Sequence, residues 1–320
     1  MRRRCAEVAA EASWVVLDED RITTYADELR ATGALVVDTD DTDADADPWA
    51  IDRRGGAEAR AGLVLAQAAI NFGSGYHPIV RKRPGLSGAR TMAAGVRDWA
   101  AANPVTPARL ARLSPADACS IFGQDEGDDA VGALMAGFAA ALNDLGNLVL
   151  DDFDGSFVAL VESAGGRAVA LVDQLDRLPD FHDVSPYRGR LVPFYKRAQL
   201  AACDLHRAFG GASPAAFTDL DRLTAFADNL VPHVLRIDGV LHYDPALVAR
   251  IDAGELLPPG CEEEVEIRAL GVHAVERLVA ALREAGTDAR PCDLDLALWW
   301  RGREPRYKAV PRHRTRTTAY

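Results

Sequence analysis

The sequence predicts a mostly α fold, a single helical domain over residues 1–320 with few short strands. Several helix starts are legible, long stretches carry helical apolar stripes, and strand character is confined to short pieces at 15–17 and 168–172. The repeated alternation of strands and helices that marks a parallel sheet is missing. An apolar content of 48% and a charged content of 26% are typical of a folded globular protein.

Four predicted helix starts place a capping side chain directly before a proline, at Thr106, Ser114, Ser213 and Asp244. Such a side chain accepts a hydrogen bond from the first helical turn, and proline suits the first helical position.

Two stretches predict long core helices. Residues 272–282 carry an apolar stripe, and residues 130–150 form an apolar region that we expect to break near Gly146. Just before the first stretch, Glu264 and Arg268 are four residues apart, so we expect them to pair along a solvated helix face.

Charge is distributed unevenly. The net charge of -12 argues against a long polyanion as partner, because nucleic-acid affinity comes mainly from basic surface. Six aspartates in residues 38–47 predict a solvated loop, with metal binding as the lesser alternative. Residues 301–320 contain seven Lys or Arg against one Glu and are expected to dock onto the acidic body, with nucleic-acid contact as the alternative.

Cysteine usage and apolar runs predict a cytoplasmic protein. The five cysteines show no metal-binding spacing, so we expect a reducing compartment and no metal site. The basic start lacks the apolar core of a secretory signal. The longest apolar run, residues 131–142, is too short to span a bilayer, so no membrane association is expected.

The segment 223–230 holds the leading candidate acid. Asp228 follows Phe226 by two residues in apolar surroundings, so this carboxylate either caps a helix or awaits a ligand. Positions two apart diverge on a helix and face the same way in extended chain. If both residues serve one pocket, the backbone must be non-helical there.

Two cations follow two aromatics at residues 193–200. Lys196 and Arg197 precede a helical run, where amides and cations together favour a phosphate; a surface turn is the alternative. Upstream, residues 71–78 contain two glycines and predict a pocket-lining loop, in which His77 is expected to be structural.

Residues 293–300 predict a short helix capped by Asp293. Asp295 and Trp299 then lie four apart on one face, as an acid and an aromatic wall of one cavity. The alternative places Trp299 in the core and Asp295 in a first turn favoured by the helix dipole.

A set of short motifs, taken in order, resembles the queuosine salvage protein family from roughly Trp14 to the last residue. The motifs are Asn-Phe at 71–72, Pro-Phe-Tyr-Lys-Arg-Ala-Gln at 193–199, Thr-Ala-Phe-Ala-Asp at 224–228, Glu-Val-Glu-Ile-Arg at 264–268, Asp-Leu-Ala-Leu-Trp at 295–299, and the ending from Pro311 to Tyr320.

The resemblance implies a helical fold similar to DNA glycosylases and hydrolysis of queuosine 5'-monophosphate to queuine and ribose 5-phosphate, with no cofactor or metal. It places the family's aromatic and acid on Phe226 and Asp228, and a later pocket aspartate on Asp295. Where many members have a further aromatic and a final Trp-Asp, this chain has Leu296 and Trp300. Part of the ligand contacts must therefore differ.

Glycosidic cleavage passes through an oxocarbenium-like state that a carboxylate can stabilise while it positions or deprotonates water. Asp228 is the candidate for that catalytic role. The leaving base, a 7-deazaguanine with a cationic arm, suits stacking on Phe226 and Trp299 and donation to Asp295.

Lys196, with Arg197, is the candidate for the 5'-phosphate. The expected partners are the free nucleotide and queuine, without a nucleic-acid polymer or a membrane. The alternatives are a glycosylase acting on tRNA or DNA and a queuosine-binding module without turnover.

Overall fold

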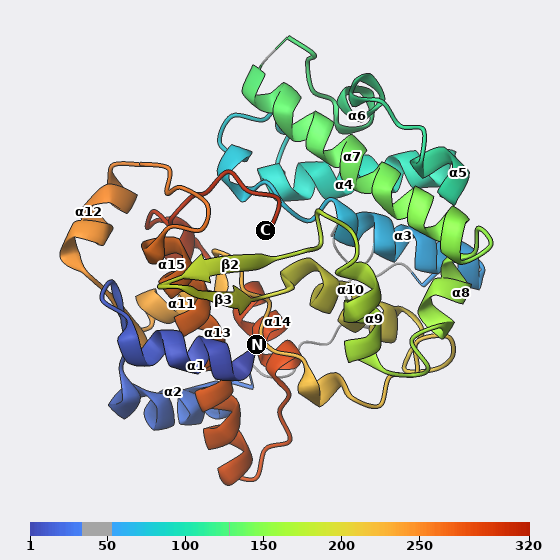
Figure 1. Ribbon diagram of the computed structural model, residues 1–320. Coiled ribbons are helices and arrows are strands. Elements are labelled where there is room, and N and C mark those ends of the chain that lie inside the picture. Colours follow the sequence, from blue (N-terminus) through green and yellow to red (C-terminus); the bar gives the residue numbers. More distant parts are fainter. Residues whose placement is uncertain (34–52, 128) are drawn as a thin grey trace.

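The computed structural model describes residues 1–33, 53–127 and 129–320, so the acidic segment 38–47 lies outside the described residues. The mostly α fold is confirmed (Figure 1). The helices and strands of the described residues are α1 (Arg2–Glu11), β1 (Val15–Leu17), α2 (Glu19–Ala31), α3 (Ala57–Ala69), α4 (Gly88–Ala102), α5 (Pro107–Leu110), α6 (Pro115–Phe122), α7 (Asp129–Asp152), α8 (Phe157–Glu162), α9 (Ala168–Leu175), β2 (Val184–Tyr187), β3 (Arg190–Pro193), α10 (Lys196–Ala208), α11 (Val231–Ile237), β4 (Leu241–Tyr243), α12 (Pro245–Asp252), α13 (Glu262–Glu284), α14 (Pro291–Arg301) and α15 (Pro305–Lys308).

Two hydrophobic cores lie side by side. Helices α3 to α10 enclose the first, and α1, α2 and α11 to α14 enclose the second around α13 (Figure 1). Two segments contribute to both: Phe226 and Cys292 pack into the first core, whereas their near neighbours Ala227 and Leu294 pack into the second. The predicted site residues on these two segments therefore lie where the cores meet.

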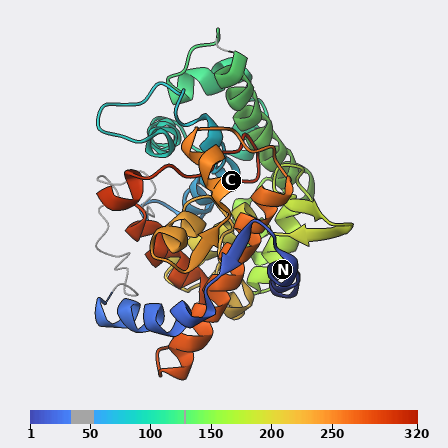
Figure 2. The ribbon, with the colours of Figure 1, turned by 90° about the vertical axis from the view of Figure 1, so that its left-hand side faces the viewer.

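The strands form two small antiparallel pairs. The predicted strand at Val15–Leu17 is confirmed and pairs with β4, with Val15 opposite Tyr243. β2 and β3 form a hairpin that projects from the body (Figure 2). The strand predicted at residues 168–172 is wrong, because it is the start of α9. Its buried residues Ala168, Leu171, Val172 and Leu175 have helical spacing that the short window concealed.

Three of the four proline helix starts are confirmed, with side-chain caps from Thr106, Ser114 and Asp244. The prediction at Ser213 is wrong: residues 213–214 form a turn, and residues 215–217 follow without regular secondary structure as Ala215 and Phe217 pack into the first core. Asp293 is not a cap either. It lies in the first turn of α14 and pairs with Arg290, the residue before the helix.

Helix α7 runs through Gly146 without the predicted break. A Cβ at Gly146 would lie 2.6 Å from the carbonyl oxygen of Pro107, so this glycine permits close packing on α5. Helix α7 has 24 residues and is therefore longer than the apolar run 131–142, which by itself is too short to span a bilayer. Among the described residues, α7 is the one helix that is long and apolar enough to cross a membrane. Of its most apolar window 56% is buried, as in a core helix of a soluble protein.

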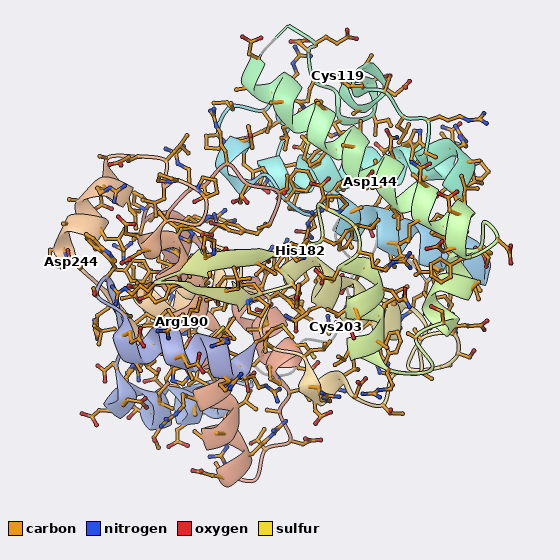
Figure 3. The ribbon with its side chains drawn as sticks, in the orientation of Figure 1. Cys119, Asp144, His182, Arg190, Cys203 and Asp244 are labelled. Carbon is orange, nitrogen blue, oxygen red and sulfur yellow. The ribbon has the colours of Figure 1, made fainter. Side chains whose placement is uncertain are left out.

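The basic end of the chain docks onto the body, as predicted. Tyr320 is buried and its carbonyl oxygen accepts a hydrogen bond of 2.9 Å from the Gly73 amide. The carbonyl oxygen of Arg314 accepts another from the amide of Leu257. The five cysteines are free thiols, and Figure 3 shows Cys119 and Cys203 well apart. The one-domain organisation and the likeness to DNA glycosylases stay predictions.

Candidate active site

The segment that carries Phe226 and Asp228 is non-helical. Residues 223–228 have no regular secondary structure, and α11 begins only at Val231. The expectation that the chain leaves helical geometry here is confirmed. Residues two apart in such chain can serve one site, as Phe226 and Asp228 were predicted to do.

Asp228 is tied to the backbone at the start of α11, whose first residue is Val231. Its Oδ1 accepts hydrogen bonds of 2.9 Å from the Leu230 amide and 3.0 Å from the Val231 amide. Within the described residues Oδ2 accepts no hydrogen bond, and the residue is partly exposed. These hydrogen bonds use only Oδ1, which fixes the carboxyl group, so Oδ2 remains open to a ligand.

Asp295 approaches the same segment from α14. It is buried, and its Oδ1 accepts a 2.9 Å hydrogen bond from the amide of Phe226. Burial raises the pKa of Asp295 well above its ordinary value, and the charge of Asp228 adds to that rise. The Phe226 amide and the cation of Lys196 act in the opposite direction. The two predicted acids therefore share one electrostatic environment.

Lys196 brings a cation to this environment. It begins α10, where its amide donates 3.1 Å to Asp183, and its Nζ donates to Asn71 at 2.6 Å to Oδ1 and 3.0 Å to the carbonyl oxygen. Burial lowers the pKa of Lys196 to about 8, against the opposing effect of Asp228. Two of its three N–H groups are engaged, which leaves one for a ligand.

Arg197 points elsewhere. Its guanidinium carbon lies 4.8 Å from the ring centre of Phe72 and 4.8 Å from that of Phe181, inside the first core. One of its terminal nitrogens donates to the carbonyl oxygen of Ala69. Consecutive helical positions face different directions, so the start of α10 brings Lys196, and not Arg197, to the acids.

The aromatic candidates differ in exposure. Phe226 is 5% exposed and packs into the first core, whereas Trp299 is partly exposed, one helical turn beyond Asp295. Trp299 meets Trp300 edge to face at 5.8 Å between ring centres. Leu296, the other departure from the family pattern, is also partly exposed. The substrate-binding roles stay predictions.

A buried ion pair, which the sequence did not reveal, holds the site together. Arg268 donates 2.9 Å to the carbonyl oxygen of Ala227 and 2.6 Å to Asp183, the residue that also caps Lys196. The predicted solvated face for Glu264 and Arg268 is wrong, since both are at most 2% exposed. Their helix runs through the second core, where charged residues are buried only with partners.

Known proteins match this chain over most of its length. Residues 79–320 match the family model described as queuosine salvage protein. A relative from Sphaerobacter thermophilus named queuosine 5'-phosphate N-glycosylase/hydrolase is 40% identical over 273 residues, 83% of each chain. Relatives with the same name from Dictyostelium discoideum and Mus musculus are 36% and 34% identical, with 56% of each chain covered. The chain belongs to the queuosine salvage protein family.

Proposed function

We propose that this chain hydrolyses the N-glycosidic bond of queuosine 5'-monophosphate and releases queuine and ribose 5-phosphate. Its family and the names of its relatives support this activity. The observation that carries it is local: Asp228 with an open carboxylate oxygen, the buried Asp295 and the cation of Lys196 surround one non-helical segment.

Asp228 acts on the sugar. The hydrogen bonds from the amides of Leu230 and Val231 fix the direction of its carboxyl group. Positive charge develops on the ribose as the base departs, and a carboxylate fixed beforehand stabilises that charge without reorganisation. Its free oxygen can also hold the attacking water or take a proton from it.

Asp295 and the aromatics act on the base. The amide of Phe226 holds Asp295 in place, so its second oxygen can face the donors and the cationic arm of queuine. Phe226 and Trp299 supply ring faces for stacking. The two carboxyl groups therefore contact different parts of the nucleotide: Asp228 contacts the sugar and Asp295 contacts the base.

The substrate is the free nucleotide, and the reaction takes place in the cytoplasm without a cofactor. A net charge of -12 opposes a polyanion, whereas a monomeric nucleotide needs only a local cationic spot such as Lys196. A polymer-directed glycosylase and a non-catalytic queuosine-binding module are the two competing functions.

One experiment separates these functions. The protein is incubated with queuosine 5'-monophosphate, queuosine, or tRNA that contains queuosine, and queuine release is followed by mass spectrometry. We expect release from the monophosphate. Release from tRNA alone would indicate the polymer-directed enzyme, and binding without release would indicate the binding module.

We expect Asp295→Asn to weaken queuine binding on the order of 10- to 100-fold, since a charge-assisted contact is lost. The same change stabilises the free protein at neutral and higher pH. Because the folded-state pKa is raised, wild-type stability falls as pH rises above the ordinary value of 3.8, and asparagine removes that loss. Thermal unfolding from acidic to alkaline pH checks this: the curves should converge toward the acid end, and an equal offset at every pH would contradict the assignment.

Because Lys196 must be protonated to bind an anion, we expect the activity on queuosine 5'-monophosphate to have an alkaline limit. The pKa of Lys196 is about 8, so kcat/KM for the monophosphate should fall above that pH as the cation loses its proton. Arginine stays charged, so Lys196→Arg should remove this limb from the pH profile. If the variant showed the same fall of kcat/KM at alkaline pH, that fall would be due to another titrating group.

A further inference from the structure

The C-terminal segment, residues 310–320, lies against both parts of the site. The residue after Asp228, Asn229, donates a hydrogen bond of 3.2 Å from its side-chain Nδ2 to the carbonyl oxygen of His313. On its other side a Cβ at Gly75 would touch the backbone of Thr315, so the loop of residues 71–77 and this segment are packed backbone to backbone. Figure 1 shows the red end of the chain running between the two halves of the molecule.

Arg312 is the residue of this segment whose charge interacts with that of Asp228. Asp228 is the carboxylate that acts on it, opposing the effect of burial, which lowers the pKa of Arg312. Burial lowers the pKa of His77 to about 3, and the charges of Arg312, Lys82 and Lys196 add to that effect. The charge of Asp228 therefore acts on both Arg312 and Lys196, and both of these cations act on His77.

The guanidinium of Arg312 is not committed to the fold. Within the described residues it makes no hydrogen bond or ion pair at bonding distance, although the residue is only partly exposed. Its neighbour Arg314 donates to the carbonyl oxygen of Gly254, and Arg268 is fully engaged with Asp183 and Ala227. The five donors of this guanidinium are therefore free to bind a ligand.

We propose that Arg312 binds the 5'-phosphate of the nucleotide and makes the site selective for nucleotide over nucleoside. This rests on the proposed function. Arg312 suits a phosphate better than Lys196 does, because it offers paired donors for bidentate binding, whereas Lys196 spends two of its N–H groups on Asn71. In a nucleotide, the phosphate and the anomeric carbon belong to one sugar, so the phosphate cation must lie close to the acid that serves the sugar.

Phosphate binding by Arg312 also changes what Asp228 can do. In the free protein the cation offsets part of the negative field of Asp228. When a phosphate dianion pairs with Arg312, that offset is cancelled, and Asp228 stabilises the developing positive sugar more fully. A nucleoside brings no phosphate and reacts against an uncompensated cation.

The test compares queuosine 5'-monophosphate with queuosine in wild type, Arg312→Gln and Arg316→Ala. Arg316 is the matched control, an exposed arginine of the same segment that lies over the ring of Tyr76. We expect Arg312→Gln to lower kcat/KM for the monophosphate on the order of 10- to 100-fold and to leave queuosine unchanged or faster. Arg316→Ala should behave as wild type. Equal losses on both substrates, or an unchanged ratio, would overturn the role of Arg312.

Binding of ribose 5-phosphate and of ribose, measured by calorimetry, keeps the inference separate from the proposed reaction. Wild type should prefer the phosphorylated sugar, and Arg312→Gln should lose that preference, while Arg312→Lys keeps part of it because the charge remains. If wild type released no queuine, the proposed function would fail, yet this comparison would still decide whether Arg312 binds phosphate. Equal affinity of wild type and Arg312→Gln for ribose 5-phosphate would refute it.

Discussion

Asp228→Asn should abolish most queuine release from queuosine 5'-monophosphate, on the order of a 1,000-fold loss in kcat, while queuine binding stays close to wild type. Asparagine keeps an oxygen at Oδ1, so the hydrogen bonds from the Leu230 and Val231 amides persist and α11 still begins at Val231. What is lost is the negative charge beside the sugar. Single-turnover kinetics and calorimetric binding of queuine measure the two effects separately.

Asp244→Asn is the matched control. The Asp244 carboxylate likewise accepts a hydrogen bond, 2.8 Å long, from a backbone amide, that of Ala246 at the start of α12, and Asp244 lies at the edge of the molecule (Figure 3). Its variant should retain wild-type turnover. Wild-type rates in Asp228→Asn would transfer the catalytic role to Asp295, and an equal loss of binding and turnover would mean that Asp228 holds the ligand in the ground state.

The sequence predicted the non-helical candidate segment correctly because that prediction depends only on residues close together in the chain. For Phe226 and Asp228 to share a site, a spacing of two requires a non-helical chain, and residues 223–228 have no regular secondary structure. Proline-linked caps at Thr106, Ser114 and Asp244 succeeded for the same reason, since each depends on residues within one turn.

Long-range partners could not be predicted. Whether Glu264 and Arg268 face solvent depends on what packs against α13, and Asp183, which pairs with Arg268, lies 85 residues away in sequence. The path through Gly146 likewise depends on the approach of α5. The sequence identifies Arg312 only as one charge of a basic end, because nothing in its sequence neighbours indicates that the charge of Asp228 acts on it.

Arg268→Ala should destabilise the protein by about 3–5 kcal/mol, since it leaves the buried carboxyl groups of Asp183 and Glu264 without their cation. The carbonyl oxygen of Ala227 also loses its donor. The free energy of unfolding from urea titration measures this. Arg250→Ala is the control: Arg250 pairs with Glu255 and Glu263 at the surface, so its loss should cost no more than about 1 kcal/mol.

Stability alone would not distinguish a role in the fold from a role in the site. Arg268 joins Asp183, which caps Lys196, to the carbonyl group between Phe226 and Asp228. Loss of this link should let the acid and the cation drift apart even in the folded fraction. At a temperature where Arg268→Ala is still folded, we therefore expect kcat/KM for the monophosphate to fall further than the folded fraction does, because small displacements of reacting groups cost large factors in rate. If activity fell only in proportion to the folded fraction, the role of Arg268 would be limited to stabilising the core. Asp228 would then be positioned by its hydrogen bonds with the Leu230 and Val231 amides alone.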